Sequence, residues 1–421
     1  MRLRTTLLLG LLTGCATPAS SSRTEAPSQA PAEAAPPPAS AGSAPASEKS
    51  DVKALFAREL APLSKQKVSA PDGSFTGEVE ATGAPTLQAG EGLFVLSIPL
   101  GTGSPLTCFV YSQPVDAGGA IYRLVEMAGQ RTELQRVRIT DIRLIGESPA
   151  VYAEAEYRVN GPRGKAAGLA KMMVYADDRV PLVCTHDEPG YSESFARVTS
   201  GLAASLQGSG GTPPASRYFE FSVIRVRGLP VGFEKHTIRE AAGGGRLTEV
   251  ESSLFFPRSP RELSVHDSVS SELSDKDGKL VARDFARASN GEPDIQMALE
   301  QVQGREYHYE GTHLGKALNG TFTAPADLAT EPGTARLLRE RFLPGPEQEV
   351  TLHYYIPTAN PAAPVQQVLR KGAAGSRELS VEMGPLKATL TLDAQGMGEK
   401  MVAPLGDTEM VRERVRVRGT P

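Results

Sequence analysis

Short runs of alternating apolar and polar residues, separated by Gly, Pro or Asn-Gly, make up most of the chain after residue 74. Such alternation is typical of strands that bury one face, because successive side chains point to opposite sides of a sheet. Between residues 51 and 206 the runs that predict strands are 75–81, 93–98, 106–111, 136–144, 151–159, 169–175 and 180–185. Residues 52–60 and 191–206 instead repeat apolar positions every three or four residues, which predicts a helix at each end of this region. The pattern therefore predicts a small α+β sandwich over residues 51–206.

The last part of the chain, residues 217–421, has almost only strand and turn patterns. Asp277-Gly278 and Asn290-Gly291 are typical two-residue hairpin turns, and only residues 334–342 have helical spacing. Many short strands at regular spacing predict a large curved antiparallel β-sheet, whose apolar concave face needs a cover. The Gly-, Pro- and Ser-rich residues 207–216 predict a linker before this domain. The expected fold class is α+β, mainly β.

The first residues, 1–15, have the organisation of a secretory signal. Positive charges at Arg2 and Arg4 precede an apolar run over residues 5–12. That run is far shorter than the roughly 20 residues with which a helix crosses a bilayer. The sequence therefore predicts that the folded body lies outside the cytoplasm.

Leu12, Thr13, Gly14 and Cys15 close this leader. They resemble the lipobox of bacterial lipoproteins, in which a Leu and two small residues precede an invariant Cys. The resemblance implies cleavage before Cys15, diacylglycerol on its sulfur and a third fatty acid, such as palmitate, on its amine, and several chains together give a stable membrane anchor. Ala16 stands where Asp would favour the inner membrane, which implies the outer membrane, with the body on its periplasmic face or at the cell surface. The alternative is an ordinary signal peptide that ends in Cys.

Residues 16–50 consist almost entirely of Ala, Pro, Ser, Glu and Gly. Too few apolar side chains are present to form a core, so we expect a disordered tether. The tether is either a spacer that lifts the folded body off the membrane or a neutral linker.

Charge and cysteine content narrow the classes of partner. The formal net charge is −4 at pH 7 and the chain has no basic block, so nucleic acid is not an expected partner. Of the three cysteines, Cys15 is the lipid site, which leaves Cys108 and Cys184. An even pair of cysteines outside the cytoplasm predicts a disulfide. Two separate buried thiols are the alternative.

Two short clusters combine residues that can carry chemistry. Residues 184–188 hold a Cys, a His and two acids, and residues 308–313 hold two His and a Glu. Zinc needs three or four ligands, and the zincin motif needs two His four positions apart on a helix. His308 and His313 are separated by five positions, with a turn expected at Gly311. We therefore predict a structural role for both clusters, with no metal and no cofactor.

The end of the chain carries Arg412, Arg414, Arg416 and Arg418 at alternate positions. This spacing predicts one polar face of a strand, at a sheet edge or toward solvent, with anionic glycolipid as a lesser alternative. The sequence holds no Gly-x-Ser-x-Gly elbow, Walker loop or dinucleotide glycine fingerprint. We therefore favour a non-enzymatic protein, although a catalytic carboxylate pair leaves no linear signature.

Three turn motifs in the last domain carry a further resemblance: residues 228–233 (GLPVGF), residues 277–280 (DGKL) and residues 392–396 (LDAQG). They are similar to those of uncharacterised envelope proteins with half-open barrels, which are related in build to the lipoprotein carriers of the Lol system. This implies a half-open barrel with a groove for an acyl chain or another apolar ligand. We therefore expect an outer-membrane lipoprotein that binds a lipid, another envelope ligand or an envelope protein. The alternatives are a scaffold or assembly lipoprotein without a small ligand, and a hydrolase with an unrecognised carboxylate pair.

Overall fold

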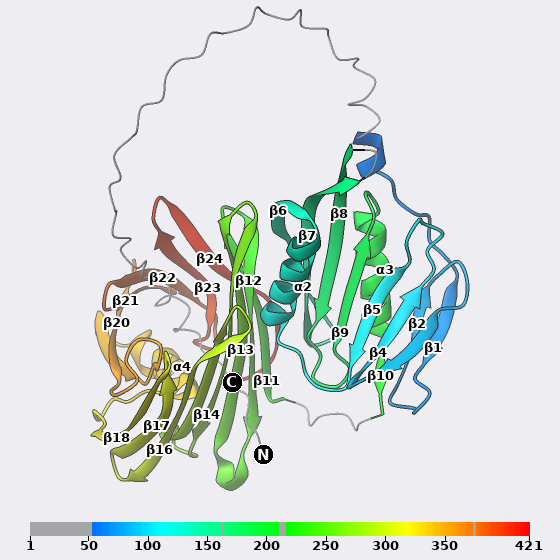
Figure 1. Ribbon diagram of the computed structural model, residues 1–421. Helices are drawn as coiled ribbons and strands as arrows, with labels where there is room; N and C mark the ends of the chain where they lie inside the picture. Colours follow the sequence, from blue (N-terminus) through cyan, green and yellow to red (C-terminus); the bar gives the residue numbers. More distant parts are fainter. Residues whose placement is uncertain (1–52, 162–163, 210–215, 374–375) are drawn as a thin grey trace, which may run out of the picture.

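The computed structural model describes residues 53–161, 164–209, 216–373 and 376–421. The signal with Cys15, the tether and most of the expected linker lie outside these residues. The described residues form two antiparallel units, a sandwich with helices and a large curved sheet (Figure 1). The predicted mainly β fold with a large, unclosed antiparallel sheet is confirmed. No helix in the described ranges has the length and apolar character to cross a bilayer.

The first unit contains two sheets in its described residues. The strands of the smaller sheet, in spatial order, are β1 (Lys65–Ser69), β2 (Phe75–Glu80) and β10 (Gln207–Gly208). Those of the larger sheet are β3 (Thr86–Gly90), β4 (Leu93–Ile98), β5 (Leu106–Tyr111), β9 (Leu182–Asp187), β8 (Gly164–Tyr175), β7 (Ser148–Gly161) and β6 (Glu133–Ile145). The start of the expected linker, residues 207–208, is thus corrected to a strand, because its backbone pairs with β2.

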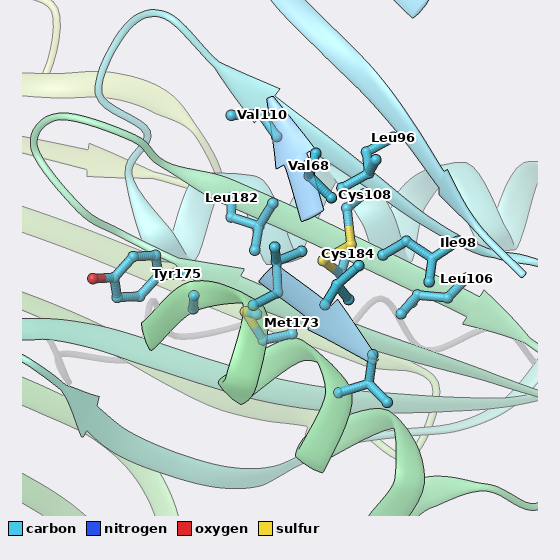
Figure 2. Close-up of a cluster of buried hydrophobic side chains, with 14 of the residues drawn as sticks. Val68, Leu96, Ile98, Leu106, Cys108, Val110, Met173, Tyr175, Leu182 and Cys184 are labelled. Atoms are coloured by element: carbon cyan, nitrogen blue, oxygen red, sulfur yellow. A yellow bond between two sulfur atoms is a disulfide. The ribbon is translucent and has the colours of Figure 1, made fainter. Parts of the chain in front are cut away.

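Helix α3 (Ser192–Ser205) covers one face of the larger sheet with the apolar stripe that the sequence predicts. Phe195, Val198 and Leu202 belong to the same buried cluster as the cysteines of the central strands. Cys108 on β5 lies directly opposite Cys184 on β9, with their Cα atoms 4.0 Å apart, and their sulfurs are joined as a disulfide in this core (Figure 2).

The second unit is one curved sheet of 14 strands in its described residues. The sheet has two halves, β11–β18 and β19–β24. They join where β11, the first strand of the unit, pairs with β24, the last. The strands, in spatial order, are β18 (Lys316–Thr323), β17 (Glu306–His313), β16 (Glu292–Gln303), β15 (Leu280–Ser289), β14 (Glu262–Ser274), β13 (Arg246–Ser259), β12 (Leu229–Glu240), β11 (Tyr218–Val226), β24 (Thr408–Gly419), β23 (Gly398–Leu405), β22 (Leu386–Leu392), β21 (Glu378–Met383), β20 (Val365–Lys371) and β19 (Glu349–Tyr354).

The two edge strands, β18 and β19, do not pair with each other, so the barrel stays open at this seam. Helix α4 (Glu331–Leu337) continues into a π-helical turn, η3 (Leu338–Phe342), and lies within the curve of the sheet (Figure 1). Leu338 and Phe342 pack into the apolar cluster of the concave face. Phe322 of β18 stacks on Tyr355, which follows β19, with ring centroids 5.9 Å apart. Side-chain packing and two backbone hydrogen bonds, between His353 of β19 and residues Asp327 and Ala329, therefore close the seam that β18 and β19 leave unpaired.

Helix α2 (Ala117–Arg131) lies between the two units (Figure 1). Ile121 and Val125 of α2 join one buried cluster with β6 and with Phe233 and Val265 on the convex face of the curved sheet. The two units therefore share a continuous apolar core, although the residues between them resemble a flexible linker.

The turns predicted from short Gly-containing motifs agree with the structure at one position and differ at two others. Asn290 and Gly291, with φ of 53° and 82°, join β15 to β16 as predicted. Asp277-Gly278 also lies in a hairpin, between β14 and β15, but the predicted two-residue turn was wrong. The Asp275 side chain accepts backbone hydrogen bonds from Asp277 and Lys279 and so organises a longer loop. Residues 229–232, expected as a turn, begin β12 instead.

Candidate functional site

A cavity of about 110 Å³ lies between the concave face of the curved sheet and α4. Its wall on one side is apolar and comes from strands β20–β23, the β22–β23 turn and the end of α4. The apolar residues of this wall are Ala335, Leu338, Leu369, Val381, Leu386, Ala388, Leu390, Leu392, Met397 and Met401, and Val250 and Ile356 complete the apolar lining. Alternation places these side chains inward, since every second residue of a strand faces the same side.

The other end of the cavity is polar. Strands β13–β15 and the first turn of α4 supply its polar groups, together with residues from β19 and β20. These residues are Thr248, Ser270, Glu272, Arg283, Glu331, Thr334, Tyr354 and Gln367. The cavity therefore has one apolar wall and one polar, charged end, as sites for small molecules commonly do.

Glu272 organises this polar end. Its side chain pairs with Arg283 on the neighbouring strand, with 3.3 Å between Oε2 and Nη1, and Oε1 accepts the backbone N–H of Glu331 at 3.0 Å. Arg283 also donates from Nη2 to Ser270 Oγ at 3.1 Å. Burial raises the pKa of Glu272 to about 7, against the lowering effect of Arg283, and the charge of Glu331 raises it further. The start of α4 is thus held by a carboxylate with a strongly perturbed pKa.

A second layer of buried charges lies next to this end on β11, β12 and β24. Arg412 is 2% exposed and pairs with Glu220 and, at 3.0 Å, with Glu234. Burial raises the pKa of Glu234 to about 8, although Arg412 opposes the shift, and the charges of Glu331 and Glu220 add to it. Arg414 is engaged by Glu220 and Asp393. The carboxylates of this layer therefore already engage both arginines.

His236 on β12 connects the two layers. It is 1% exposed, and its Nε2 lies 3.2 Å from Oε2 of Glu331. Its ring meets Tyr218 edge to face, with centroids 5.4 Å apart. Glu331 therefore touches both Glu272, through its backbone, and His236, through its side chain.

The prediction for the arginines of the last strand was wrong for two of the four. Arg412 and Arg414 are buried on the concave side of a strand in the middle of the sheet, while Arg418 is exposed and pairs with Glu147. The reason is the pairing of β24 with β11, about two hundred residues earlier, which brings Glu220 next to Arg412. The only local signal is an acidic residue between two phenylalanines of a mostly apolar strand, as at Glu220.

The cysteine and histidine clusters are not part of the cavity lining. Cys184 is bonded to Cys108, and the buried His186 lies 3.4 Å from Thr102 Oγ1 through its Nε2. Burial lowers the pKa of His186. His308 and His313 lie in β17, and Gly311, which was expected in a turn, is inside this strand with φ of 145°. In the described ranges, no three side chains of His, Cys, Asp or Glu are grouped to hold a metal.

Comparisons with known proteins give structural likenesses alone. No protein-family model and no curated protein matches the chain. A β-barrel-like protein of the domain of unknown function DUF1849 from Brucella abortus is 12% identical, with a TM-score of 0.37, over 49% of this chain and 100% of that one. A DUF1089 family protein from Pseudomonas aeruginosa is 15% identical, with a TM-score of 0.26, over 46% and 92% of the two chains. A protein from Bacteroides thetaiotaomicron is 13% identical, with a TM-score of 0.22, over 38% and 52%.

Proposed function

We propose that this chain is an outer-membrane lipoprotein, anchored through Cys15, that binds a small apolar ligand inside its half-open barrel without transforming it. The cavity beside α4 carries the proposal. The apolar wall would bury the apolar part of a ligand, and the polar end would orient the polar group at the head of that ligand. The lipobox at residues 12–15 supports the anchor.

The size of the cavity limits the ligand. An engineered apolar cavity of about 150 Å³ binds benzene, so about 110 Å³ suits a small ring or a chain segment of similar bulk. Helix α4 forms one side of the cavity, and its π-helical turn at Leu338–Phe342 is a feature that recurs at functional sites.

The anchor is tested by Cys15→Ser followed by cell fractionation and mass spectrometry of the N-terminus. We expect the wild-type chain in the outer-membrane fraction with an acylated N-terminus, and the variant in the soluble fraction. If the variant remains as firmly bound to membranes as the wild type, the lipoprotein assignment fails.

Ligand binding is tested by native mass spectrometry of the purified protein, followed by solvent extraction of whatever co-purifies. The substitution Ala388→Leu adds bulk inside the cavity, whereas Thr389→Leu on the same strand points to the opposite face and is the matched control. We expect the first variant to lose the bound ligand and the second to keep it. A wild-type protein that takes up no apolar molecule would contradict the binding function.

A further inference from the structure

The charges that line the cavity are not balanced. Glu272 and Glu331 are acidic and Arg283 alone is basic among the described lining residues. Both terminal nitrogens of Arg283 are already engaged, by Glu272 and Ser270. The Glu331 carboxylate lies 3.2 Å from Nε2 of His236 and contacts no arginine of the cavity lining. The polar end therefore has one more carboxylate than it has arginines.

The neighbouring Arg412 and Arg414 do not neutralise the excess of carboxylates at the polar end. Arg412 and Arg414 pair with Glu220, Glu234 and Asp393, which are three carboxylates for two guanidinium groups. The negative charge of Glu331 contributes to the raised pKa of both Glu234 and Glu272. A positive charge placed at this end would relieve that repulsion.

An unpartnered polar atom lies at the same end. Thr248 lines the cavity and is 3% exposed, and its Oγ1 has no hydrogen-bond partner among the described residues. A buried polar atom without a partner is unfavourable, because its lost hydration is not replaced by a hydrogen bond. The Nε of Arg283 is also without a partner, and that donor would instead suit an anionic head. Thr248 Oγ1 and Arg283 Nε both indicate a polar group on the ligand. The surplus of carboxylates favours a positive charge on that group.

We propose that the ligand is a primary amine on a small apolar ring or chain, with its ammonium group held by Glu331 and Thr248. This inference rests on the proposed binding function and names its ligand class. An ammonium group is a compact cation with three donors, which matches a carboxylate and a hydroxyl acceptor. The apolar body then lies against the leucines and methionines of β20–β23 and of the β22–β23 turn.

The test is isothermal titration calorimetry of the full acylated chain in phosphatidylcholine nanodiscs at pH 7.5, with empty nanodiscs as the blank. The probes are n-hexylamine, 1-hexanol and hexanoate, which share one apolar body and differ in the charge of the head. We expect hexylamine to bind at least about tenfold more tightly than hexanol, and hexanoate to bind most weakly.

The substitution Glu331→Gln removes the charge and keeps the shape of the side chain. We expect it to weaken hexylamine binding about tenfold and to weaken hexanol binding much less, since hexanol carries no charge for Glu331 to hold. Glu340→Gln, in the following π-helical turn, is the matched control because that side chain is 53% exposed and absent from the cavity lining. Circular dichroism of each variant verifies the fold. If Glu331→Gln does not fold, the affinities of the wild-type protein for the three probes still show which charge of the head it prefers.

The outcomes separate the two proposals. Equal binding of hexylamine and hexanol, or tightest binding of hexanoate, overturns the amine and keeps an apolar ligand. Binding of none of the three probes overturns the amine and counts against the cavity as a ligand site.

Discussion

The carboxylate of Asp267, on β14 of the curved sheet, accepts a hydrogen bond of 2.9 Å from the backbone N–H of Gly118, in the first turn of α2. Its second oxygen accepts the N–H of Gly119 at 2.7 Å. The first N–H groups of a helix have no partner within the helix, and a negative charge there is favourable. One unit therefore caps a helix of the other inside the core that both units share.

The close approach at Gly118 leads to the first prediction. A Cβ at this position would lie 2.2 Å from Val265 Cγ1 and 2.4 Å from Asp267 Oδ1, so Gly118→Ala forces the units apart. We expect a loss of about 1–3 kcal/mol in the free energy of unfolding, measured by urea titration. Gly201→Ala on α3 is the matched control, because a Cβ there meets nothing within 4 Å, and it should stabilise the protein by up to about 1 kcal/mol. Equal effects of the two substitutions would refute the steric explanation.

The same contact makes stability depend on pH. Burial and the nearby Asp116 raise the pKa of Asp267 to about 6, despite the hydrogen bonds from Ser253 and α2 that lower it. The unfolded chain has the ordinary value of about 3.9, so the folded state binds more protons between these two values. The contribution of Asp267 to the free energy of unfolding is therefore fully present below about pH 4. It is lost as the pH rises through about 6, and the loss is about 3 kcal/mol at most.

Asp267→Asn removes this titration and keeps the size of the side chain. Urea unfolding measures the free energy of unfolding of the wild type and the variant between pH 4 and pH 7. The pH dependence of the difference between the two is the contribution of the Asp267 titration. We expect the variant to gain stability relative to the wild type as the pH rises. Two pH curves that run parallel would show that Asp267 does not titrate in this window.

The disulfide gives the third prediction. Cys108 and Cys184 are 76 positions apart, and a crosslink that closes a loop of this length stabilises a protein by up to about 4 kcal/mol, mainly by restricting the unfolded chain. Replacing both by Ala should lower the urea midpoint accordingly. A reductant should lower the midpoint of the wild type and leave that of the double variant unchanged. A wild-type midpoint that does not respond to reductant in the denatured state would contradict the crosslink.

The buried arginine gives the fourth prediction. Arg412→Leu would leave the buried Glu234 without its guanidinium partner and Glu220, also 1% exposed, with Arg414 alone. Removing one member of a buried ion pair costs about 3–5 kcal/mol, so we expect a loss of this size in urea unfolding. Arg418→Leu is the control, since Arg418 is 52% exposed and pairs with an exposed Glu147, and its effect should stay within about 0.5 kcal/mol. A small effect at Arg412 would refute the buried ion pairs of Arg412 as a major source of stability.

Helix α2 shows why one element was missing from the sequence interpretation. Its sequence begins Ala117-Gly118-Gly119, and each Gly disfavours a helix by about 1 kcal/mol relative to Ala. The compensating cap comes from Asp267, which is 149 positions away from Gly118. Strands β1, β3 and β23 were also missed, and their burial patterns show few fully buried positions.

The sequence by itself determined what depends on neighbouring residues. Alternation of apolar and polar positions predicted most strands, a three-to-four spacing predicted α3, and Asn290-Gly291 predicted its hairpin. Only the tertiary structure decided that Arg412 is buried, that α2 is capped by the other unit and that a charged cavity lies beside α4. Each of these depends on strands that pair across long stretches of chain, and the energy of a buried charge depends on partners that local sequence does not contain.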